Sequence, residues 1–118
     1  MYRKNRLRKN EEFQIIFKQG KSVANRQFVI YSLEKEKQDD FRVGISVSKK
    51  MGNAVKRNHL RRWIKEMIRL RSEEMKTNQD LIVICRLPAV DLEFDQFKSS
   101  LYHCMKKANL FRLEKQGH

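Results

Sequence analysis

The stretch VKRNHLRRWIKEMIR, residues 55–69, gives the clearest structural signal in this sequence, because its apolar and basic residues each recur at the spacing of an α-helix. Within these residues there are six Arg or Lys side chains and a single acid, Glu66. One arc of the expected helix is apolar and comprises Leu60, Trp63, Ile64, Met67 and Leu70. The opposite arc comprises Arg57, Asn58, Arg61, Arg62, Lys65 and Arg69. The stretch therefore predicts an amphipathic helix with a cationic outer face.

The crowding of like charge on this helix costs stability. Arg57, Arg61, Lys65 and Arg69 follow one another at i, i+4 spacing, and each step costs about 0.2 to 0.5 kcal/mol of repulsion. A merely solvated face would alternate the sign of its charges, and this face does not. The pattern favours a face that is compensated by an external polyanion.

The start of the helix points to phosphate in particular. Asn53 is the expected N-cap, and Lys49, Lys50 and Lys56 crowd the end at which the helix dipole is already positive. Free backbone amides and cations at a helix N-terminus together form an anion site.

The residues before this helix predict a basic arm, a helix and a hairpin. Residues 1–9 are basic and are expected to be loosely ordered. Residues 10–19 suit a short helix capped by Asn10. Residues 26–35 are rich in β-branched and aromatic residues, and residues 41–50 begin with strict alternation of apolar and polar residues, so the two predict an antiparallel hairpin.

The basic helix is expected to run to about Met75. The residues after it predict a strand and a final helix. Residues 80–86 form a short continuous apolar run, which indicates a central strand buried on both faces, and Pro88 ends it. Residues 93–107 carry apolar residues at helical spacing. The chain 1–118 is thus expected to be one domain in the order α-β-β-α-β-α, an α/β sandwich within the broad α+β group, with helices packed on a small sheet.

The amino-acid composition limits the kinds of partner and location to expect for this protein. With 27 Lys and Arg against 14 Asp and Glu, the formal charge is +13, which favours a nucleic-acid partner. We expect no membrane association, because the sequence has no apolar span of about 18 residues, and a cytoplasmic protein, because the N-terminal residues lack a secretory signal pattern. Cys85 and Cys104 lie in apolar segments and are expected to be buried thiols, and the histidines have no metal-ligand spacing.

Three aromatic residues have two possible roles. Phe13, Phe17 and Tyr31 suit a hydrophobic core, and they equally suit a platform on which single-stranded RNA stacks its bases. The spacing alone leaves both possibilities open.

The segment KKMGNAVKRNHLRRWIK, residues 49–65, resembles the RNR motif of the bacterial ribonuclease P protein, and the flanking NEEFQIIFKQGKSVANRQFVIY and RVGISVSKK resemble the same family. The resemblance implies an α/β sandwich with a left-handed crossover. It further implies that the motif binds a large catalytic RNA, and that a cleft holds the 5′ leader of precursor tRNA. The RNA-binding residues would be Lys49, Lys50, Lys56, Arg57, Asn58, Arg61, Arg62, Lys65 and Arg69. The cleft would comprise Phe13, Phe17 and Tyr31, with Arg57, Asn58 and Arg61 on its rim.

The function that the resemblance implies is that of the protein subunit of an endoribonuclease, which removes the leader to give the mature 5′ end of tRNA. It implies Mg²⁺ ions held mainly by RNA, with no catalytic residue, metal ligand or tightly bound cofactor on the protein and no protein partner required. The charge alone would also permit a non-enzymatic RNA-binding protein such as a ribosomal component. A DNA-binding helix protein and a metal nuclease that acts alone fit the residues less well.

Overall fold

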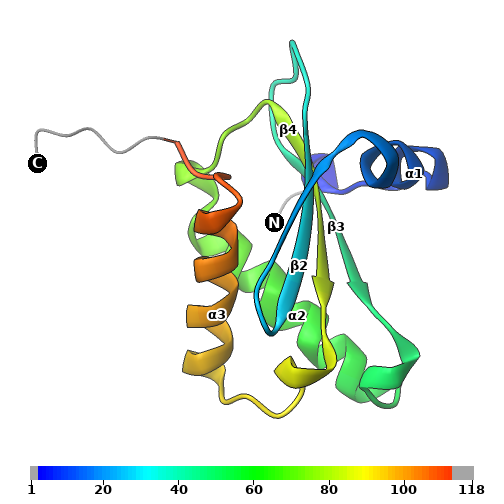
Figure 1. Ribbon diagram of the computed structural model, residues 1–118, viewed down its shortest axis with the longest axis vertical. Coiled ribbons are helices and arrows are strands. Elements are labelled where there is room, and N and C mark those ends of the chain that lie inside the picture. Colours follow the sequence, from blue (N-terminus) through cyan, green and yellow to red (C-terminus); the bar gives the residue numbers. More distant parts are fainter. Residues whose placement is uncertain (1–2, 113–118) are drawn as a thin grey trace, which may run out of the picture.

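The computed structural model describes residues 3–112, in which a four-stranded sheet carries helices on both faces. Helix α1 (Asn10–Gln19) lies on one face of the sheet, and helices α2 (Ala54–Leu70) and α3 (Phe94–Lys107) lie on the other (Figure 1). The strand order is β1-β2-β4-β3. The predicted α/β sandwich is therefore confirmed.

Strand β4 (Gln79–Cys85) is the centre of the sheet, as its apolar sequence predicts. It pairs antiparallel with β2 (Phe28–Glu34) along one edge and parallel with β3 (Arg42–Val47) along the other. Leu81, Ile82 and Val83 are completely buried. A strand that is apolar on both faces needs cover on both, and helices on the two sides supply it.

The predicted hairpin between residues 26–35 and 41–50 is wrong. The two strands exist, but β4 lies between them, and β2 pairs instead with β1 (Lys21–Ala24). Strand β1 was not predicted, because it is short, its four residues are largely exposed, and its polar and apolar residues do not alternate. The observed order is therefore α-β-β-β-α-β-α. Alternation identifies a strand and its faces, but it does not identify the neighbouring strand.

The segment between β3 and β4 contains α2 and forms a parallel crossover. The side chain of Asn53 accepts a hydrogen bond from the backbone amide of Lys56 at 2.9 Å, so the predicted N-cap is confirmed. The helix ends at Leu70 and not near Met75, since residues 72–74 form a separate 3-10 turn. Leu70, predicted on the apolar arc, is 54% exposed, and Ile68 is buried in its place. The left-handed sense of the crossover stays a prediction.

The main core lies between the sheet and the two helices α2 and α3. Its helical members are Leu60, Ile64, Met67, Ile68, Phe97, Leu101, Cys104 and Met105. The opposite face has a smaller core, in which Leu7, Ile16 and Ile82 are buried beneath α1. Both cysteines are buried, as expected, and burial raises the pKa of the Cys85 thiol to about 11.

The N-terminal segment differs from the loose arm predicted for residues 1–9. Its first two residues lie outside the described part, but the rest lies against β3. The Asn5 amide is buried and donates to the Phe41 carbonyl at 2.8 Å, and the backbone amide of Leu7 donates to the Val43 carbonyl. The basic composition of residues 1–9 gave no indication of these two hydrogen bonds to the residues at the start of β3. The N-cap of α1 is Lys9 rather than Asn10.

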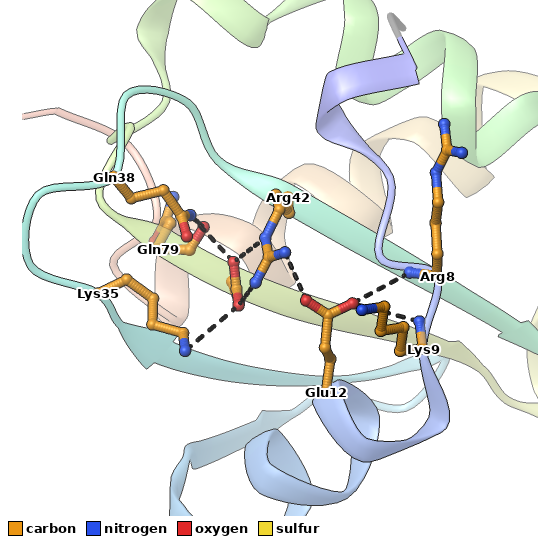
Figure 2. Close-up of polar contacts among 8 residues, drawn as sticks. Arg8, Lys9, Glu12, Lys35, Gln38, Arg42 and Gln79 are labelled. Atoms are coloured by element: carbon orange, nitrogen blue, oxygen red, sulfur yellow. Dashed lines mark hydrogen bonds and ion pairs between the residues drawn. The ribbon is translucent and has the colours of Figure 1, made fainter.

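A polar network fixes α1 to the sheet (Figure 2). Arg42 on β3 donates to both carboxylate oxygens of Asp80 on β4, at 3.0 and 2.7 Å, and to Glu12 on α1 at 2.5 Å. Asp80 is 1% exposed and also accepts from Gln38. Burial raises the pKa of Glu12, but hydrogen bonds from the Lys9 amide and from Arg42 outweigh it and hold that pKa below 4.5.

Substitution Arg42→Ala is predicted to lower the free energy of unfolding by about 3 kcal/mol, because it leaves a buried carboxylate without its main counter-charge. Urea denaturation followed by circular dichroism measures the change. The matched control is Glu74→Gln, which removes the exposed pair between Glu74 and Arg71 and should cost less than about 1 kcal/mol. Similar losses in both variants would show that the network contributes no more than a surface ion pair.

The pH dependence of stability tests Glu12. Because its pKa is lowered on folding, its contribution is complete above the ordinary value of 4.5 and is lost as the pH falls through the lower folded pKa. The difference in free energy of unfolding between the wild type and Glu12→Gln should therefore shrink as the pH is lowered from neutral to below 4.5. A difference that is constant with pH would contradict this assignment.

Candidate nucleic-acid interface

Cations gather where α2 begins. Lys49 and Lys50 lie in a 3-10 turn directly after β3, and Lys56 and Arg57 lie in the first turn of α2. No acid lies in that first turn. The positive end of the helix dipole and these side chains therefore add to one another.

In the described part of the chain, these cations have no carboxylate as a counter-charge. In residues 3–112, none of seven basic side chains of the predicted site forms an ion pair with a carboxylate: Lys49, Lys50, Lys56, Arg57, Arg61, Arg62 and Lys65. Two of them are oriented by neutral groups. Arg57 donates to the Gly52 carbonyl at 3.2 Å, and Arg61 donates to the Asn58 side chain at 3.2 Å and to the Val47 carbonyl at 3.4 Å. Neutral acceptors position a guanidinium group without cancelling its charge, which leaves it available for phosphate.

Arg69 differs from the other predicted RNA-binding residues. Its guanidinium donates to both carboxylate oxygens of Glu66, at 2.9 and 2.6 Å, and thereby holds the pKa of Glu66 below its usual value. Glu66, the single acid of residues 55–69, thus offsets a cation near the C-terminal end of α2. The uncompensated charge is concentrated toward the N-terminal end.

The three aromatic residues lie together on the α1 face of the sheet. The rings of Phe17 and Tyr31 meet edge to face, with centroids 4.9 Å apart. Phe13 covers Gly44, whose missing side chain leaves room for the ring: a Cβ there would lie 2.3 Å from it. Phe13 and Tyr31 pack on the smaller core, whereas Phe17 is 44% exposed. Phe13 and Tyr31 are therefore partly core residues, and Phe17 offers an open ring.

The register of the sheet connects the aromatic group to the basic helix. Tyr31, Ile82 and Gly44 form one row across β2, β4 and β3. The next row on the same face, about 7 Å further along, contains Val29, Ile84 and Ser46. Ser46 is exposed, and the other two are half-buried. The next residue of β3 is Val47, whose backbone carbonyl accepts a hydrogen bond from the Arg61 guanidinium.

The row of Val29, Ile84 and Ser46 therefore forms a floor on the α1 face, between the aromatic residues and the end of β3 that leads into α2. Sequence reasoning missed this floor, because it depends on the pairing of β3 with β4. The alternation in residues 41–50 did place Ser46 on the polar face, which was the one available signal.

Two other kinds of feature, a metal-ligand cluster and a membrane-spanning helix, are absent from residues 3–112. This part of the chain contains no group of three or more His, Cys, Asp or Glu residues that could hold a metal ion. Its helices are also too short or too polar to cross a membrane.

Comparison with known proteins identifies close relatives. The family model described as Ribonuclease P matches residues 1–109. The ribonuclease P protein component of Bacillus cereus strain AH187 is 45% identical over 115 residues, which cover 98% of this chain and all of that protein. The solved ribonuclease P protein of Staphylococcus aureus is 47% identical, with a TM-score of 0.87 over 92% of this chain and 98% of that one. That of Thermotoga maritima is 32% identical, with a TM-score of 0.79 over 93% and 98%.

Substitution Gly44→Ala tests the placement of the aromatic group. The added methyl group must displace the Phe13 ring, so we predict a five- to tenfold weaker affinity, at order of magnitude, for a single-stranded RNA oligonucleotide. Val83→Ala is the control: it destabilises β4 from the opposite, α2-facing side and should leave that affinity unchanged. Fluorescence anisotropy of labelled RNA measures both. Equal losses would attribute the effect to stability alone.

Proposed function

This chain belongs to the ribonuclease P protein family, and we propose that it acts as the protein subunit of ribonuclease P in the cytoplasm. In this role it binds the catalytic RNA and precursor tRNA, and it promotes endonucleolytic removal of the 5′ leader with no other protein required. The observation that carries the proposal is the set of seven basic side chains that have no carboxylate partner within residues 3–112, together with the aromatic group on the α1 face of the sheet.

Each part of the surface has a defined physical task. The cations of α2 neutralise RNA phosphates and release their counterions, which supplies affinity without sequence preference. The exposed ring of Phe17, supported by Tyr31, stacks a base of the leader. The floor of Val29, Ile84 and Ser46 gives that strand a path toward Arg57 and Arg61. Precursor tRNA therefore binds better than the product, which lacks a leader.

The protein contributes binding and positioning, and we assign the hydrolysis to the RNA. Family resemblance implies Mg²⁺ ions, which would activate a water molecule and offset negative charge during hydrolysis. The described residues have no carboxylate or histidine cluster that fits such an ion, so we propose that RNA phosphates hold it. The residues of this chain then act by holding the leader in place beside the catalytic RNA.

Substitution Arg57→Ala or Phe17→Ala is predicted to weaken the binding of precursor tRNA about tenfold, because each removes a leader contact, and to leave mature tRNA binding nearly unchanged. Binding to the complex of protein and catalytic RNA measures both affinities. The matched control is Arg69→Ala. Because Glu66 already offsets the charge of Arg69, this variant should lose less affinity for precursor tRNA. Equal losses for precursor and mature tRNA would reject the leader site.

A cleavage assay separates the subunit from a non-enzymatic RNA-binding protein. At a low Mg²⁺ concentration at which the catalytic RNA alone is nearly inactive, the purified protein should restore cleavage of precursor tRNA at the mature 5′ end. The protein without RNA should not cleave at any Mg²⁺ concentration. Failure of the rescue would favour the non-enzymatic alternative, and cleavage by protein alone would place the chemistry on this chain.

A further inference from the structure

A second group of aromatic residues lies on the flank of α2 that faces α3. The Trp63 ring is 4.5 Å from the His59 ring, 5.2 Å from Phe94 and 5.2 Å from Phe97, as measured between centroids. Phe97 is fully buried, whereas Phe94 is 38% exposed and His59 is exposed. The group therefore begins in the main core and ends at the surface with two accessible rings.

Cations surround the exposed rings. The Lys98 ammonium lies 5.7 Å from the centre of the Phe94 ring. Lys56 and Arg62 each lie three residues from His59 along α2, on neighbouring turns. In the part of the chain that the structure describes, none of these three cations is paired with a carboxylate. Rings beside free cations are the combination that binds unpaired nucleotides through stacking and charge.

In residues 3–112, the acids nearest to this patch form no ion pair with its three cations. Glu66 is already bonded to Arg69. Asp95 lines a different cavity together with Asn25 and His103, on the side of α3 that faces the β1–β2 turn. Glu93 is the N-cap residue of α3.

We propose that His59, Trp63 and Phe94, with Lys56, Arg62 and Lys98, bind an unpaired base of the catalytic RNA. This inference rests on the proposed function and assigns the two flanks of α2 to different RNAs. The aromatic part of the leader site lies on the α1 face of the sheet, and the patch lies on the opposite face, which α2 and α3 cover (Figure 1). The sheet separates the patch from the Phe17 and Tyr31 rings, so a base stacked on Phe17 does not also contact the patch. The catalytic RNA must reach α2 in any case.

Trp63 is the only tryptophan of the chain, so its fluorescence reports this patch directly. Catalytic RNA should quench the emission at saturation and should shield Trp63 from acrylamide. A leader oligonucleotide that binds the protein should leave the emission and the acrylamide quenching unchanged. Quenching and shielding by the leader oligonucleotide would overturn the assignment of the two flanks.

Variants of the exposed rings complete the test. Phe94→Ala and His59→Ala should each weaken binding of the catalytic RNA about tenfold, whereas Phe94→Tyr, which keeps a ring, should restore it. The control is Leu87→Ala, at an apolar residue that is 59% exposed outside the patch, and it should bind like the wild type.

The ratio of precursor to mature tRNA affinity should stay unchanged in all four variants, because the leader site is intact. Unchanged affinity of Phe94→Ala and His59→Ala for the catalytic RNA would overturn the proposal. A fall in the precursor to mature ratio would place the patch in the leader site instead. Loss of the leader preference in the wild type, with quenching by the catalytic RNA retained, would reject the leader site and support the patch.

Discussion

Strand β4 imposes the constraint on which the rest of the structure depends. Its side chains are apolar on both faces, so the sheet needs cover on both, and α1 provides it on one side while α2 and α3 provide it on the other. Because β3 lies parallel to β4, the chain must cross over between them, and α2 is that crossover. Its N-terminus therefore follows the end of β3, the strand whose Gly44 lies under the Phe13 ring. The burial of one strand thus attaches the start of the cationic helix to a strand that also supports the aromatic group.

The charge of α2 is the feature that folding alone does not explain. Arg42 shows how the protein treats a cation that serves the fold, since it gives Arg42 two carboxylates, one of them buried. In the described residues 3–112, Arg57 and Arg61 instead donate to neutral acceptors. Within residues 3–112, the chain therefore gives carboxylates to the cation that supports packing and none to Arg57 and Arg61 on α2. That contrast, within one small domain, is the strongest structural argument for a phosphate-rich partner.

The sequence predicted the individual elements better than their arrangement. The period of residues 55–69, the apolar run of β4 and the cap at Asn53 are local signals, and each is confirmed. The pairing of β2 with β4 is set by burial of distant residues, so no turn between neighbours could reveal it. The floor at Ser46 and the anchor at Asn5 were missed for the same reason. The aromatic group Phe13, Phe17 and Tyr31 is brought together, and its role in leader binding stays a prediction.

The central claim is that the repulsion along α2 is retained because RNA offsets it, and Lys65→Glu tests this most directly. The new acid would lie one turn from Arg61 and from Arg69, where opposite charges stabilise a helix by about 0.2 to 0.5 kcal/mol per pair. The measurement pairs the free energy of unfolding of the isolated protein with its affinity for the catalytic RNA. The account predicts opposite changes: the free protein becomes more stable, and RNA binding weakens at least tenfold, with a shallower salt dependence. A variant that loses stability, or that binds RNA as well as the wild type, would contradict it.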